Sequence, residues 1–124
     1  MALKDVANSL VDLCKQGKFE EAMNTHYADH IVSVEATGNE AMPAVMEGIE
    51  AVRGKTQWWV ENHEVHSTDI SGPFFNSNQP NQFCMYLKSD VTFKPTGERS
   101  TLSEVCLYDV EQGKVVREHF YYAV

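Results

Sequence analysis

The sequence predicts an α+β fold, in which three helices from the N-terminal half pack on one face of a strongly curved, mostly antiparallel sheet. Apolar residues recur at helical spacing over the first half of the chain. Beyond residue 65 they alternate at strand spacing, in segments that turn residues separate. The 124 residues suit a single domain, 1–124, with one modest core. The expected order of elements is α-α-β-α-β-β-β-β.

The N-terminal third predicts two helices and a short strand. Over residues 3–14 apolar side chains at i, i+3, i+4 and i+7 form one stripe, and Gly17 is placed to end this helix. Helical spacing continues over residues 19–27 and predicts a second, shorter helix. Residues 31–35 then change to β-branched side chains and predict a strand that ends at Glu35.

A loop and a third helix follow. Residues 36–48 hold two glycines and a proline, which predicts a covering loop. Residues 49–63 return to helical spacing, with Val52, Thr56 and Trp59 on one face and His63 at the end.

The second half predicts four strands, at residues 65–75, 82–94, 100–110 and 114–122. Polar, proline or glycine residues separate them. Helices followed by a run of strands are typical of an α+β domain. Because the sheet is expected to curve around the helices, we expect a conical cavity on its inner face.

Composition excludes several classes of partner. The net charge of −8, from 18 acidic and 10 basic side chains, argues against nucleic acid and against an anionic membrane. No apolar run approaches the ~20 residues that span a bilayer, and the N-terminus lacks a signal peptide's apolar stretch, so a cytoplasmic protein is expected. The three cysteines are widely spaced and odd in number, which favours reduced thiols.

Metal and cofactor sites are not expected. The pairs His26/His30 and His63/His66 have no further ligand at a known metal spacing. The chain also has no glycine-rich phosphate loop and no nucleotide fingerprint. The expected ligand is therefore a small hydrophobic molecule in the cavity.

Four segments carry a resemblance to a known family: GKFEEA (17–22), YADHIVSVE (27–35), MEGIEAVRG (46–54) and GKVVREHFY (113–121). Their order and spacing resemble the NTF2-like superfamily, in particular its SnoaL-like (polyketide cyclase-like) and ketosteroid isomerase-like members. The resemblance spans essentially the whole chain. It implies the NTF2-like cone and a homodimer formed through the outer face of the sheet. It does not imply one function, because this fold hosts isomerases, cyclases, dehydratases, hydrolases and binding-only modules.

The resemblance implies two catalytic carboxyls. Glu35 falls where the isomerases place their aspartate general base, and Glu104 falls near their second acid, which donates a hydrogen bond to the developing oxyanion. Both positions carry Glu, so each carboxyl reaches one methylene further. The isomerases' oxyanion tyrosine falls at or near Leu10, which cannot donate. An ion pair between Glu35 and Arg53 is the structural alternative to catalysis.

The alternation of side chains along paired strands predicts which residues of the last strand line the cavity. A three-residue loop at 111–113 would place Val110 opposite Lys114 and Glu104 opposite Phe120. The last strand would then turn four residues toward the cavity: Val116, Glu118, Phe120 and Tyr122. A slip of one residue would reverse this assignment. In that case the cavity residues become His119 and Tyr121.

The leading hypothesis is a cofactor-independent cyclase or isomerase that acts on a hydrophobic carbonyl compound. Glu35 would remove a proton next to the carbonyl, and protonated Glu104, or a Tyr or His in its place, would stabilise the enolate. Seven side chains are expected to contact the substrate: His26, Tyr27, Trp59, His63, Glu118, Phe120 and Tyr122. One alternative is a module that binds a ligand without catalysis. The absence of a hydrogen-bond donor at Leu10, where the isomerases have their tyrosine, favours this alternative. Another is a dimerisation domain whose cavity is filled by side chains.

Overall fold

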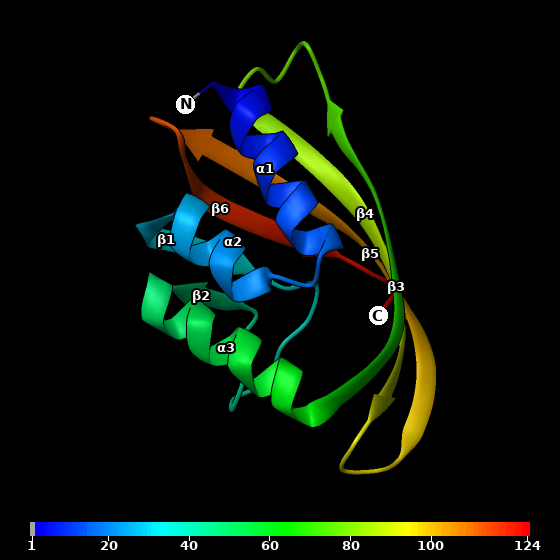
Figure 1. Cartoon of the computed structure of the whole chain (residues 1–124). Coiled ribbons are helices and arrows are strands. Elements are labelled where there is room, and N and C mark those ends of the chain that lie inside the picture. The colour runs from blue at the N-terminus through cyan, green and yellow to red at the C-terminus, as the bar shows by residue number, and fades with distance from the viewer. Residues whose placement is uncertain (1) are drawn as a thin grey trace.

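Three helices lie on the concave face of one strongly curved, six-stranded sheet (Figure 1). The structure is a computed structural model that describes residues 2–124. The helices are α1 (Leu3–Lys15), α2 (Phe19–His26) and α3 (Ile49–Asn62). The strands are β1 (Tyr27–Val34), β2 (Val45–Glu47), β3 (His63–Phe75), β4 (Gln82–Phe93), β5 (Glu98–Glu111) and β6 (Lys114–Tyr121). The predicted α+β architecture is therefore confirmed.

The strand order of the sheet is β2-β1-β6-β5-β4-β3. All neighbours are antiparallel except β1 and β6, which run parallel. This pair places Ser33 of β1 beside Glu118 of β6 and Val34 beside His119. The first long strand thus lies next to the last one, one strand in from the edge of the sheet.

The main differences from the prediction concern β1, β2 and β3. β1 begins at Tyr27, directly after α2, and not at residue 31. The prediction missed its first four residues because none of them is β-branched. β2 falls inside the segment predicted as a loop, since three residues are too few to show an alternation. β3 begins at His63, the residue that follows α3.

The predicted pairing of β5 with β6 is wrong in register. Glu111 pairs with Lys114, and an irregularity between Asp109 and Val110 brings Val110 opposite Val115. Val115, and not Val116, is consequently the fully buried residue. A bulge of this kind adds one residue to one strand, and nothing in the local sequence announces it.

The same bulge determines which side chains of β6 face the helices. Beyond it, Tyr108 pairs with Glu118 and Cys106 pairs with Phe120, so Glu104 does not pair with Phe120. Glu118 and Phe120 lie on the concave face with Cys106 and Tyr108. The alternative cavity residues, His119 and Tyr121, alternate with them and point to the convex face.

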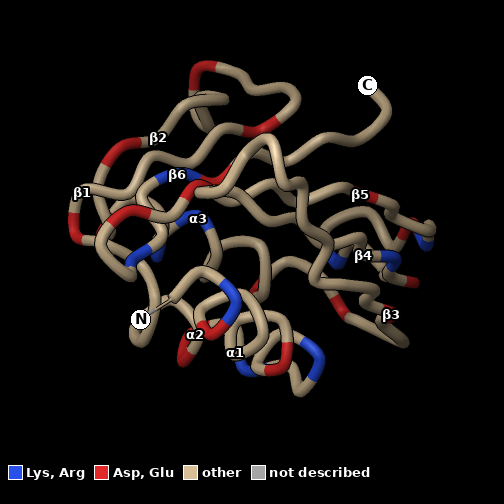
Figure 2. Tube along the Cα trace, turned by 90° about the horizontal axis from the view of Figure 1, so that it is seen from above, with Lys and Arg blue, Asp and Glu red and all other residues tan. Residues whose placement is uncertain are grey.

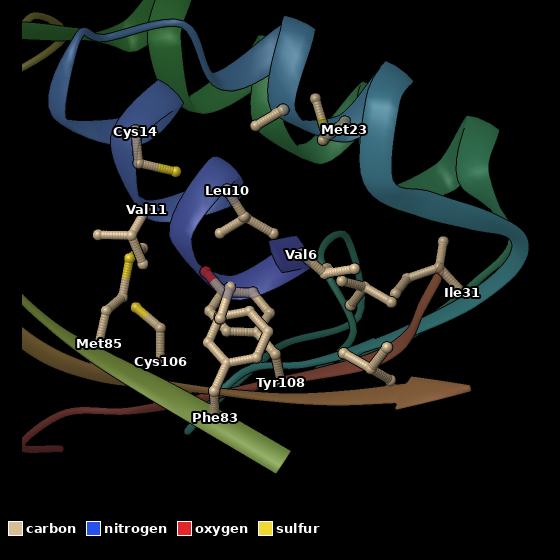
Figure 3. Close-up of a cluster of buried hydrophobic side chains, with 14 of the residues drawn as sticks. Val6, Leu10, Val11, Cys14, Met23, Ile31, Phe83, Met85, Cys106 and Tyr108 are labelled. Atoms are coloured by element: carbon tan, nitrogen blue, oxygen red, sulfur yellow. The ribbon is translucent and has the colours of Figure 1, made fainter. Parts of the chain in front are cut away.

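The core lies between α1 and the middle of the sheet (Figure 3). On α1, Val6, Leu10 and Val11 are buried and face the sheet. From the sheet, Phe83 stacks on Tyr108 with ring centroids 4.9 Å apart. Full burial of each such side chain stabilises the fold by roughly 1.5–3 kcal/mol.

Charged residues are scattered along the trace, with carboxylates in excess (Figure 2). Over residues 2–124, no helix is long and apolar enough to cross a membrane.

Candidate functional site

A cavity of about 610 Å³ lies between the helices and the concave face of the sheet. Apolar and aromatic side chains form most of its wall, with a few polar groups among them, as is usual for small-molecule sites. The exposed Val60 and Val65, on either side of the turn from α3 to β3, line its rim. Ten lining side chains carry the argument. They come from helices α1 and α3, from strands β1, β3, β5 and β6, and from the residue that follows β1: Leu10, Tyr27, Glu35, Lys55, Trp59, His63, Glu104, Cys106, Glu118 and Phe120.

Glu35 enters the cavity because it continues the inward-facing row of β1. Ile31 and Ser33 are fully buried, and Glu35 follows at the same strand parity. Its backbone N–H donates to the carbonyl of Ala44 at 2.8 Å, which fixes the end of the strand. The side chain keeps 28% of its surface exposed.

Lys55, not Arg53, is the basic partner of Glu35. The Nζ atom of Lys55 lies 3.5 Å from Glu35 Oε2, whereas Arg53 pairs with Glu50 at 2.9 Å on the surface of α3. Lys55 is 12% exposed at its side chain. Sequence reasoning missed this residue, although Lys55 lies on the face of α3 that carries Val52 and Trp59 and so points inward with them.

Lys55 also lies close to the buried carboxyl of Glu118. Its Nζ donates to Ser33 Oγ and lies 3.9 Å from Glu118 Oε2. The ammonium also stands over the ring of Phe120, 4.9 Å from the centroid. Lys55 therefore sits between two carboxyls and an aromatic face on the wall of the cavity.

Glu118 is held by hydroxyl donors. Ser33 Oγ donates to its Oε2 at 2.7 Å, and the hydroxyl of Tyr27 donates to its Oε1. Burial raises the pKa of Glu118, and the charge of Lys55 and these two hydrogen bonds oppose the rise. Burial and the adjacent carboxylate raise the pKa of Tyr27 well above its ordinary value. Glu118 is thus the buried anchor of the network.

Glu104 sits in a different environment from Glu35. Burial raises its pKa to about 7, and the charges of Glu35 and Glu118 act in the same direction. The Cys106 thiol, which donates to Glu104 Oε1 at 3.5 Å, lowers the pKa by less. Near neutral pH a large share of Glu104 is consequently protonated. One cavity thus holds an ion-paired carboxyl and a second carboxyl tuned toward its acid form.

Aromatic rings line the cavity near the α3–β3 junction. Trp59 and His63 stack at 4.2 Å with an interplanar angle of 12°, and Phe93 lies 5.2 Å from His63. The Nδ1 atom of His63 is 2.7 Å from the carbonyl of Trp59. Because a carbonyl can only accept, Nδ1 carries the proton and Nε2 of the neutral ring remains an acceptor.

His26 and Tyr122 do not line the cavity, contrary to the prediction. His26 is buried, its Nε2 bonds with Ser9 Oγ at 2.7 Å, and burial lowers its pKa. A histidine on an apolar helix face gives no sequence signal that separates core from cavity. Tyr122 lies just past β6, where burial and the charge of Glu35 raise the pKa of its hydroxyl.

The other predicted residues do meet at the cavity. Its lining includes Glu35, Glu104, Tyr27, Trp59, His63, Glu118 and Phe120. Across residues 2–124, no group of three or more His, Cys, Asp and Glu side chains is arranged to hold a metal ion.

Comparisons with known proteins agree with the overall fold. The sequence profile of the SnoaL-like domain matches residues 1–122. A crystal structure from Mesorhizobium loti is 45% identical over 98% of this chain and all of its own, with a TM-score of 0.90. That protein is described provisionally as a SnoaL-like polyketide cyclase, with carbohydrate phosphatase added in brackets. A provisional isomerase from Bacillus subtilis shares the fold at 16% identity and a TM-score of 0.78, over 99% of this chain and 90% of its own. The comparison with curated proteins gave no match.

Proposed function

We propose that this chain, which belongs to the SnoaL-like domain family, catalyses proton transfer next to a carbonyl group in a small hydrophobic compound, as a cyclase or isomerase. The observation that carries the proposal is the pair of carboxyls, Glu35 and Glu104, in one largely apolar cavity. Their surroundings differ, which suits one to act as base and the other as acid. The provisional description of the Mesorhizobium loti relative as a polyketide cyclase supports the same class of substrate.

In the proposed reaction Glu35 removes the proton from the carbon next to the carbonyl. Its Oε2 atom lies 3.5 Å from the Nζ atom of Lys55, at the wall of the cavity. Glu104 returns a proton to the substrate, because its pKa of about 7 leaves a substantial fraction of it protonated near neutral pH. Trp59, His63 and Phe120 offer flat apolar surfaces on which a cyclic substrate could rest.

Deuterium exchange tests this proposal without knowledge of the natural substrate. The protein is incubated in heavy water with cyclic and aryl ketones, and NMR follows deuterium entering the carbon next to the carbonyl. We expect the wild type to accelerate exchange and Glu35→Gln to lose the acceleration. Glu47→Gln is the matched control, because Glu47 is exposed on β2 and lies outside the cavity.

The outcomes separate catalysis from binding. Full exchange by Glu35→Gln removes Glu35 from the mechanism. A wild-type protein that binds ketones but accelerates no exchange refutes the catalytic proposal and favours the binding module.

We also propose that two copies associate through the convex face of the sheet. Tyr86, Val105 and Tyr121 pair across β4, β5 and β6 in one row, and all three are exposed. A contiguous apolar row on an exposed sheet is typical of an interface. The row lies on the opposite face from the cavity, so association would leave the mouth open.

A further inference from the structure

Proton removal next to a carbonyl places negative charge on the carbonyl oxygen, and the cavity needs a group that receives it. The hydroxyls of Ser33 and Tyr27 already donate to Glu118. Leu10 lines the cavity without a polar atom. Glu104 has one proton, which the proposed reaction transfers to the substrate. The charge therefore requires another partner.

Lys55 has the donor for this task. An ammonium carries three N–H donors. Ser33 Oγ accepts one of them, and Glu35 Oε2 accepts another at the long distance of 3.5 Å. Glu118 Oε2, at 3.9 Å, is beyond hydrogen-bond range. One donor is consequently left for a ligand in the space above Phe120.

No other cation is similarly placed among the described residues. Lys15 and Lys55 are the basic side chains that line the cavity, and Lys15 is exposed at the end of α1. Lys55 is held deep in the wall by Ser33, by the ion pairs and by the ring of Phe120.

We propose that the Lys55 ammonium binds the carbonyl oxygen of the substrate and stabilises the oxyanion that forms when Glu35 takes the proton. This role rests on the proposed function and deepens it. Because Nζ lies only 3.5 Å from the base, the oxygen and the departing proton must belong to one carbonyl and its neighbouring carbon. The substrate class is thus a ketone, or a related carbonyl compound, with an acidic hydrogen on the adjacent carbon.

The charges balance along this step. The proton leaves carbon for Glu35, the C–H electron pair forms a C=C bond, and the C=O π pair moves to oxygen. Glu35 becomes neutral as the oxygen becomes negative. Lys55 therefore exchanges one anionic partner for another, and no charge is left unpaired in the cavity.

The experiment uses para-nitrophenol as a stable mimic of the oxyanion and para-nitroanisole as its uncharged isostere. Absorbance reports the ionised fraction of the bound phenol at each pH. In Lys55→Met we expect the pKa of the bound phenol to rise by about one unit or more, a tenfold effect. Affinity for para-nitroanisole should stay within twofold. Lys94→Met, in the exposed turn between β4 and β5, is the matched control.

Glu35→Gln supplies a second, opposite result. The amide imitates the protonated base, so the bound phenol should ionise at lower pH than in the wild type. An unchanged pKa of the bound phenol in Lys55→Met overturns the proposal. If Lys55→Met also loses para-nitroanisole, its cavity has collapsed around unpaired Glu118. In that case the pKa of the bound phenol and the affinity for para-nitroanisole are measured in the double variant Lys55→Met, Glu118→Gln, which leaves no buried charge unpaired. A raised pKa of the bound phenol in this variant supports the proposal, and an unchanged one overturns it.

Failure of this inference and failure of the proposed function give different results. Ionisation of the bound phenol needs no catalytic turnover. A clear effect of Lys55 in a protein that exchanges no ketone proton would refute the proposed function alone. Exchange that Glu35→Gln abolishes, with a phenol pKa indifferent to Lys55, would refute the Lys55 role alone.

Discussion

Glu104 makes the stability of this protein depend on pH in a direction opposite to that of most surface carboxylates. Its pKa is about 7 in the folded chain, against an ordinary value of 4.5 that applies once the chain unfolds. Between these two values the folded state holds a proton that the unfolded state has lost. The free energy of unfolding therefore falls as pH rises through this interval.

The size of the effect follows from the two pKa values. Each pH unit between them corresponds to about 1.4 kcal/mol, so the cost of ionising Glu104 in place is about 3 kcal/mol. Glu104→Gln imitates the protonated side chain and avoids this cost. We expect the variant to match the wild type near pH ~4 and to exceed its free energy of unfolding by about 3 kcal/mol near pH ~9.

Urea unfolding followed by tryptophan fluorescence measures this difference at each pH. Glu47→Gln, which changes an exposed carboxylate, should show no comparable trend. The reasoning is refuted if the difference between Glu104→Gln and wild type is the same at both ends of the pH range.

Three further predictions concern the core, the backbone and the convex face. Phe83→Ala should lower the free energy of unfolding by about 3–5 kcal/mol in urea, because the ring is 1% exposed; Phe74→Ala, 51% exposed, should cost much less. Gly72→Ala should destabilise more than Gly17→Ala in thermal unfolding. Both have positive φ, but a Cβ at residue 72 would lie 3.2 Å from the Cys84 carbonyl, while Gly17 has open space; equal losses would contradict this. Tyr121→Glu should shift the mass in light scattering from dimer to monomer without loss of ligand binding, and a dimeric variant would exclude this face.

Local periodicity was sufficient to predict the three helices and the five longer strands, but not the three-residue β2. Strand parity carries the inward direction from Ile31 through Ser33 to Glu35, so the position of Glu35 at the cavity follows from residues that are close in sequence. Glu104 and Cys106 share one strand parity on β5, and both line the cavity.

The rest depends on contacts that no local pattern contains. Lysine is mostly a surface residue, so Lys55 reads as part of the solvated face of α3 although its spacing matches Val52. Its ammonium lies 3.9 Å from the buried carboxyl of Glu118, which is distant in sequence, and this ion pair offsets the cost of removing both charges from water. The bulge between Asp109 and Val110, which shifts the register between β5 and β6, also has no distinctive residue.

The parallel pairing of β1 with β6 brings Ser33, Glu35 and Glu118 close enough to Lys55 to form the candidate site. It places Ser33 directly beside Glu118, so one hydroxyl accepts from Lys55 and donates to the buried carboxyl. This contact holds the ammonium beside Ser33, and Glu35, one residue past the end of β1, lies 3.5 Å from the same Nζ atom. The distance between the base and the proposed oxyanion partner is therefore set by backbone pairing and not by a mobile loop. A site held in this way costs little reorganisation when charge moves from the base to the substrate oxygen.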